Sequence, residues 1–131
     1  MRIRSIKPEF WQDPAVSAID TQLVYAGPVL TNRSDTEAVS PIAHDVRYVY
    51  MFFAGDQLLY VGRAWNPWRR IEKHRRQKKW WSRVDYMALV SVTGRTAFES
   101  DAHVDVFERL CIHLLAPSEN KSRPAIRRGV V

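Results

Sequence analysis

Residues 46–61 read VRYVYMFFAGDQLLYV, and this stretch predicts a β-hairpin. Residues 46–53 and 58–61 are rich in β-branched and aromatic side chains, which favour strands. A short turn that contains Gly55 separates the two runs, and a turn of this kind joins neighbouring antiparallel strands. The hairpin is therefore the expected centre of the fold.

A basic helix is expected directly after the hairpin. Asn66 is a favourable N-cap residue and Pro67 suits the first position of a helix. The helix is expected to extend to about Arg76. Arg70 and His74 lie one turn apart within it, so their side chains share one face.

A third strand and a second helix follow. Residues 83–92 alternate between apolar and polar, which predicts a strand, and Gly94 ends it. Thr96 and Glu99 have capping-box spacing, in which both side chains satisfy the first N–H groups of a helix. Apolar residues at helical spacing extend this helix to just before Pro117. The expected fold is α+β: a small three-stranded antiparallel sheet flanked by helices, in the order β-β-α-β-α.

The N-terminal third has a different character. Residues 1–44 carry four of the seven prolines, and each proline fixes φ and lacks a donor, so long elements are not expected there. A short helix around residues 13–19 and an extended piece at 22–24 are expected, and the polar residues 32–40 are expected to form a loop. We therefore expect an irregular arm over 1–44, structural or DNA-contacting, a core domain over 45–120 and a basic tail over 121–131.

Composition restricts the class of protein. The chain has 131 residues, a hydrophobic fraction of 46% and a formal charge of +6, values typical of one small basic globular domain. A single cysteine excludes an internal disulfide framework and a cysteine-built zinc site, and it indicates a reducing compartment such as the cytoplasm. No apolar run approaches the ~20 residues that span a bilayer, so no membrane partner is expected.

Most of the positive charge lies in one segment. Residues 63–83 contain nine Lys+Arg and one acid, a charge of +8, so the rest of the chain sums to −2. Four of the five tryptophans fall in the same window. Clustered cations neutralise phosphates and indoles stack on bases, which predicts a nucleic-acid partner. The alternative is a solvated helix face that tryptophans pin to the core. The candidate DNA-contacting residues are Arg63, Arg69, Lys73, Arg75, Arg76, Lys78, Lys79 and Trp80.

Two further features allow catalysis. Arg70 can bind a phosphate and His74 can orient a nucleophile or transfer a proton, although a solvated basic helix would show the same pair. Glu108 lies at the edge of the apolar face of the last helix, where a carboxylate needs compensation. A divalent cation would provide it, and so would an ion pair with an arginine such as Arg109.

Together these residues resemble the GIY-YIG endonuclease family. The resemblance covers about residues 46–120 and departs at Tyr48, where the first triplet normally begins with glycine. It rests on Tyr48-Val49-Tyr50, nine intervening residues, Tyr60-Val61-Gly62, Arg70, His74, Glu108, Ile112, Pro117 and Asn120.

The resemblance implies a metal-dependent DNA endonuclease that hydrolyses a phosphodiester with water. Arg70 would contact the scissile phosphate, with Arg63 as a second basic group. Tyr50 or Tyr60 would activate or position the water, and neighbouring cations and the metal would have to lower the tyrosine pKa from about 10 for general-base work. Glu108 would hold the one Mg²⁺ or Mn²⁺ ion. The implied catalytic residues are Tyr50, Tyr60, Arg70, His74 and Glu108, and the implied supporting residues are Gly62 and Asn120.

Other functions with the same fold remain open. One is a catalytically inactive DNA-binding module that keeps the basic helix without a metal at Glu108. Another is a structure-specific nuclease subunit that works with other replication or repair proteins. The enzyme is expected to act as a monomer or as a DNA-dependent dimer.

Overall fold

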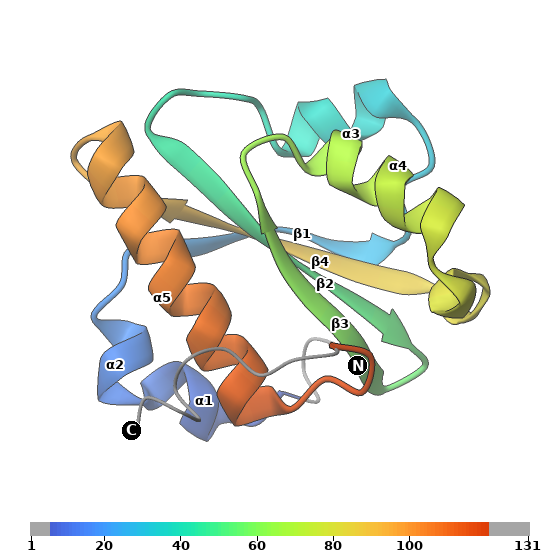
Figure 1. The fold of residues 1–131 in the computed structure, drawn as a ribbon. Coiled ribbons are helices and arrows are strands. Elements are labelled where there is room, and N and C mark those ends of the chain that lie inside the picture. Colours follow the sequence, from blue (N-terminus) through green and yellow to red (C-terminus); the bar gives the residue numbers. More distant parts are fainter. Residues whose placement is uncertain (1–5, 121–131) are drawn as a thin grey trace.

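A computed structural model describes residues 6–120 and shows an antiparallel sheet with helices on both faces (Figure 1). The strands of this part of the chain are β1 (Thr21–Pro28), β2 (Val46–Ala54), β3 (Gln57–Ala64) and β4 (Tyr86–Thr93). They pair in the order β1-β4-β2-β3. The α+β class is therefore confirmed, but the expectation of three strands is wrong, because β1 pairs with β4 as a fourth strand.

The predicted hairpin is the β2–β3 pair. Its turn places Gly55 at φ +59°, a left-handed conformation that glycine adopts without steric cost. The register sets Tyr50 directly opposite Gly62. Because β2 is central, its side chains are buried on both faces of the sheet, whereas β3 forms one edge.

The two predicted helices are present. Helix α4 (Pro67–Gln77) is followed by a short 3₁₀ helix, η2 (Lys79–Arg83), and α5 (Ala97–Leu115) follows β4. Pro67 occupies the first turn of α4, but among residues 6–120 the Asn66 side chain finds no capping partner, so the expected side-chain cap is wrong. The Thr96 cap is confirmed, since its hydroxyl accepts a hydrogen bond from the Glu99 N–H at 3.1 Å. None of the helices in the described range is long and apolar enough to cross a membrane.

The N-terminal third holds more structure than expected. It contains α1 (Pro8–Gln12), α2 (Pro14–Ser17), β1 and α3 (Arg33–Val39). The loop expected over 32–40 is wrong: Asn32 caps α3, and its side chain accepts a hydrogen bond from the Asp35 N–H at 2.8 Å.

The prolines of this segment lie at element boundaries rather than preventing structure. Pro8 and Pro14 begin α1 and α2, where a missing N–H costs nothing. Pro28 ends β1, an edge strand, where proline is tolerated. The basic tail expected over 121–131 lies outside the described residues.

Two apolar cores lie on opposite faces of the sheet. Helices α1, α2 and α5 cover one face, and α3, α4 and η2 cover the other (Figure 1). Alternate residues of β2 serve the two cores: Val49 and Met51 face α5, whereas Tyr50 and Phe52 face α4. This alternation brings a tyrosine of the central strand beneath the basic helix.

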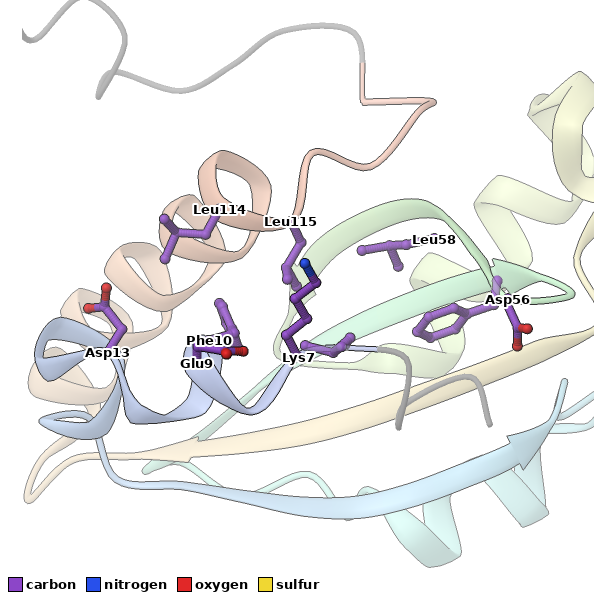
Figure 2. A pocket seen from close by; sticks show the side chains of 10 residues that line it. Lys7, Glu9, Phe10, Asp13, Asp56, Leu58, Leu114 and Leu115 are labelled. Atoms are coloured by element: carbon purple, nitrogen blue, oxygen red, sulfur yellow. The ribbon is translucent and has the colours of Figure 1, made fainter.

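The N-terminal helices close one end of the α5 core (Figure 2). Phe10 of α1 and Leu115 of α5 line a hollow of about 540 Å³ near the hairpin tip. Among residues 6–120, the charged side chains that line it are Glu9, Asp13, Asp56 and Lys7. The described lining therefore carries an excess of negative charge, which disfavours the binding of phosphate.

Candidate active site

The five predicted catalytic side chains converge beside edge strand β3. Tyr50 comes from β2, Tyr60 from β3, Arg70 and His74 from α4, and Glu108 from α5. The Tyr50 hydroxyl lies 2.9 Å from Nε2 of His74, a hydrogen bond. The ring of Tyr60 lies 4.7 Å from that of His74 and 6.2 Å from that of Tyr50.

Gly62 makes this arrangement possible. The ring of Tyr50 crosses over its cross-strand neighbour Gly62, and a Cβ at Gly62 would overlap the Tyr50 hydroxyl. Only glycine leaves that space, so the hydroxyl can pass over β3 and reach His74 on α4. Gly62 is therefore a structural requirement of the Tyr50–His74 pair.

The charge of Arg70 acts on every other member of the group. Its guanidinium lowers the pKa of Tyr50, Tyr60, His74 and Glu108, in each case behind a larger effect of burial. This shared influence places the Arg70 guanidinium within electrostatic reach of all four groups.

Burial sets the protonation states in the group. It is the largest cause of the raised pKa of Tyr50 and Tyr60, and the Glu108 carboxylate raises both further. The expectation that the surrounding cations lower the tyrosine pKa is therefore wrong for the chain's own residues, because burial outweighs Arg70. Burial, with Lys78, Arg70 and Lys73, lowers the pKa of His74 to about 4, so His74 is neutral at pH 7.

Exposure separates the group into two sets. Tyr50 is 1% exposed and His74 is 4% exposed, so both lie beneath the surface. Tyr60 is half-buried, Arg70 is exposed and the Glu108 side chain keeps 20% of its surface exposed. A ligand at this surface therefore meets Tyr60, Arg70 and Glu108 first.

Glu108 pairs with Arg63 rather than with Arg109. Nε of Arg63 lies 3.6 Å from Oε1 of Glu108, and the same guanidinium donates to the carboxylate of Asp105. Arg109 pairs with Asp105 at 3.1 Å. Burial raises the pKa of Glu108, while Arg63 lowers it. Arg63 thus connects β3 to the acidic face of α5 and lies within the site.

Glu108 and Asp105 are the carboxylates of the site that could contribute to the binding of a divalent cation. Within residues 6–120, no group of three or more His, Cys, Asp or Glu side chains could hold a metal ion. Mg²⁺ is usually bound by one or two carboxylates, with phosphates of the substrate and water as its other ligands. Glu108 is the residue that would hold it, with the Asp105 carboxylate one turn away on α5.

Asn120 holds the edge of β3 next to Gly62. Its amide nitrogen donates to the Val61 carbonyl at 2.9 Å, and its amide oxygen accepts from the Val61 N–H at 3.0 Å. The N–H groups of Ser118 and Glu119 bond to the carbonyls of residues 58 and 59. The segment after α5 therefore pairs with β3 much as a further strand would, and this pairing ends next to the candidate catalytic residues.

The predicted DNA-contacting cations lie along α4 and the turn after it. Arg75 is paired with Glu72 at 2.7 Å, whereas Arg69 and Lys73 are exposed along the helix. Arg76 and Lys79 are exposed as well, and Lys78 is half-buried at the end of α4.

Trp80 does not provide an open stacking surface. Its ring is half-buried and stacks on Tyr60 with a centroid distance of 5.2 Å and an interplanar angle of 23°. It also packs 6.1 Å from Phe52. Trp80 therefore forms a wall behind Tyr60.

Tyr48, the departure from the family pattern, does not fill the site. It is buried, and its hydroxyl donates to the Pro41 carbonyl at 2.6 Å. The side chain therefore anchors the loop that precedes β2, and the space around Tyr50 and Gly62 does not contain its hydroxyl.

The structure adds two residues that the sequence did not identify. Arg47 and Trp65 line a cleft of about 270 Å³ together with Arg63 and Arg70. Arg47 carries no sequence signal, because an arginine in an alternating strand is ordinary. Trp65 lies two residues after Arg63 within the basic segment, a signal that did not distinguish it from the other tryptophans.

Comparisons of this chain with models of protein families, with curated proteins and with solved structures found no match.

Proposed function

We propose that this protein is a metal-dependent DNA endonuclease that hydrolyses one phosphodiester bond per active site. The observation that carries the proposal is the convergence of Tyr60, Arg70 and Glu108 from separate elements at one surface, where the charge of Arg70 acts on the other two. These groups supply a hydroxyl, a fixed cation and a carboxylate, which are the parts that phosphodiester hydrolysis needs.

The arginines hold the scissile phosphate. Hydrolysis develops negative charge on the non-bridging oxygens, and a guanidinium binds two such oxygens in a planar fork. Arg70 is exposed beside Tyr60, and Arg63 lines the same cleft. Arg70 therefore contacts the phosphate directly. Arg63 moves partly away from Glu108 and contacts the phosphate as well.

Tyr60 orients the attacking water. Its hydroxyl is half-buried, and its pKa is raised, so it holds a water by hydrogen bonding more readily than it removes a proton. Tyr50 and His74 are buried beneath it and act as positioning residues through the contact of both rings with Tyr60. A divalent cation on Glu108, when bound, supplies positive charge to the leaving 3′ oxygen.

The test is nicking of supercoiled plasmid DNA in Mg²⁺ or Mn²⁺. The wild-type chain should convert the plasmid to the open-circular form, and a chelator should prevent it. Glu108→Gln keeps the size of the side chain and removes its charge, so the nicking rate should fall by about a hundredfold or more. Arg70→Ala should lower the rate to a similar extent, because it removes the phosphate contact.

Glu99→Gln is the matched control, since Glu99 belongs to the same helix but bonds to Arg95 at the N-terminus of α5. It should nick DNA at the wild-type rate. Equal nicking by the wild type and Glu108→Gln would overturn the proposal. DNA binding without metal-dependent nicking would instead identify an inactive binding module of the same fold.

A further inference from the structure

A cleft opens beside Arg70 at the surface of the candidate site. It has a volume of about 270 Å³, just below the range of about 300–1,000 Å³ for drug-sized ligand pockets. Three of its lining side chains are arginines. Arg47 is paired with Asp101 at 2.6 Å and Arg63 with Asp105 and Glu108, so the exposed Arg70 is the lining cation most available to an anion. We call it the arginine cleft, and its lining residues are Arg47, Arg63, Ala64, Trp65, Arg70, Asp101 and Val104.

Trp65 is the unusual member of this lining. Among residues 6–120, which include all the tryptophans, it is the one whose ring is exposed, at 52%. Trp68, Trp80 and Trp81 pack against the α4 core. Its exposed indole and the neighbouring arginines together offer a flat aromatic face beside positive charge, a combination that suits a base next to a phosphate.

The exposed indole is held in place. Its Nε1 donates to the Ala43 carbonyl at 3.1 Å, so the one polar atom of the ring is satisfied within the protein. The loop that carries Ala43 is itself fixed: the Tyr48 hydroxyl donates to the Pro41 carbonyl, and Nη1 of Arg47 donates to the His44 carbonyl at 3.0 Å. A ring fixed before binding loses little conformational entropy when a ligand stacks on it.

We propose that Trp65 is a stacking platform for a nucleobase next to the phosphate that Arg63 and Arg70 hold. The indole has no free hydrogen-bonding atom for reading a base edge, so its contribution is stacking, which every base accepts. In an intact duplex both faces of a base are covered by its neighbours. The indole therefore meets a base face only where the stack is open, and the substrate class is DNA with an unstacked nucleotide at the cleavage point, as in a single strand, a flap or a branch.

This inference rests on the proposed endonuclease function for its substrate, but its test measures binding without metal. The probes are a fluorescently labelled oligothymidine strand, an abasic strand of the same length and a blunt duplex, all in chelator. The main variant is Trp65→Leu, which stays apolar but lacks an aromatic face. It should weaken binding of the oligothymidine by about tenfold and leave binding of the abasic strand unchanged.

Two further variants separate stacking from folding. Trp65→Phe keeps an aromatic ring and should recover most of the lost affinity, while it loses the bond to Ala43. Phe98→Ala is the matched control, because Phe98 is exposed but does not line the arginine cleft. It should bind all three probes as the wild type does.

Several outcomes would overturn the inference. An equal loss on the abasic strand would show that Trp65 acts by shaping the cleft, and an unchanged affinity for oligothymidine would show that the ring meets no base. A greater loss on the blunt duplex than on the single strand would exclude the unstacked substrate class. Failure of plasmid nicking with the Trp65 effect intact would reject the endonuclease proposal and leave a base-binding site.

Discussion

Gly62 decides where the Tyr50 hydroxyl can lie, and therefore whether this hydroxyl reaches His74. The side chain of Tyr50 occupies the volume that any Cβ at Gly62 would need. A methyl group there must displace the tyrosine ring, because the glycine lies in a paired strand whose backbone is held by its neighbours.

Gly62→Ala should therefore damage the site more than the fold. We expect the nicking rate to fall by about a hundredfold, since a displacement of about 1 Å in supporting groups has effects of this size. The free energy of unfolding should fall by about 1–3 kcal/mol, as in overpacked cores. Plasmid nicking and urea unfolding measure the two quantities.

The matched control is Gly27→Ala in β1, where a Cβ would also meet a tyrosine hydroxyl, that of Tyr25, at 2.8 Å. The Tyr25 hydroxyl donates to the Pro28 carbonyl at 2.6 Å, whereas the Tyr50 hydroxyl bonds to His74. Gly27→Ala should leave nicking unchanged. A fully active Gly62→Ala enzyme would show that the Tyr50–His74 bond does not serve the reaction.

His74 gives stability a pH dependence of known sign. Its pKa is about 4 in the folded chain and about 6.5 in an unfolded one, so below pH 6.5 the unfolded chain binds more protons. Stability is therefore unaffected by His74 above about pH 6.5 and falls as the pH decreases from 6.5 to 4. The expected loss by pH 4 is about 3 kcal/mol.

Urea unfolding at several pH values between 4 and 7 measures this loss. Glu108 acts in the opposite direction, because its raised pKa makes the folded chain bind a proton more readily on acidification. The wild type must therefore be compared with His74→Gln, which keeps a polar side chain near Tyr50 and lacks the titration. Identical pH dependence in both proteins would contradict the burial of a neutral histidine.

At the scale of elements, turn and cap residues predicted most of the fold, but the pairing of strands that are distant in the sequence could not be predicted from them. The hairpin and α5 were predictable because Gly55 and Thr96 act through their own neighbours in the chain. The pairing of β1 with β4 joins residues about 70 positions apart, such as Thr21 and Val92. The short apolar run of β1 does not indicate which strand it pairs with. The residues of α3 are mostly polar, so they were predicted to form a loop, although Asn32 is a good N-cap residue.

The residues of the candidate site could be predicted from the sequence, but the cleft beside them could not. Tyr50, Tyr60, Arg70, His74 and Glu108 were identified by their spacing and their resemblance to a family, and the structure brings them together. The arginine cleft was not predictable, because its shape depends on contacts from the loop before β2 and from α5. The sequence also did not show that Tyr60 is more accessible than Tyr50, because this depends on β2 being a central strand and β3 an edge strand.

At the scale of the whole molecule, positive and negative charges gather in different parts of the described structure. Cations gather on α4 and in the arginine cleft, whereas the hollow beneath α1 and the hairpin tip carries Glu9, Asp13 and Asp56. For the described residues, a polyanion should be attracted to the first side and repelled from the second. If the proposed DNA partner binds, we expect its backbone to lie along α4.

The salt dependence of binding tests this orientation. Each phosphate contact in duplex DNA contributes about 0.9 to the slope of log K against log salt concentration. Arg69 and Lys73 are exposed one turn apart on α4, so Arg69→Gln and Lys73→Gln should each reduce the slope by about one.

Arg95→Gln is the control, since the Arg95 side chain is 90% exposed at the start of α5 and outside the arginine cleft. The slope should not change in this variant, because only charges that lie along the bound backbone release counterions. Equal slopes for all three variants and the wild type would mean that DNA does not follow α4.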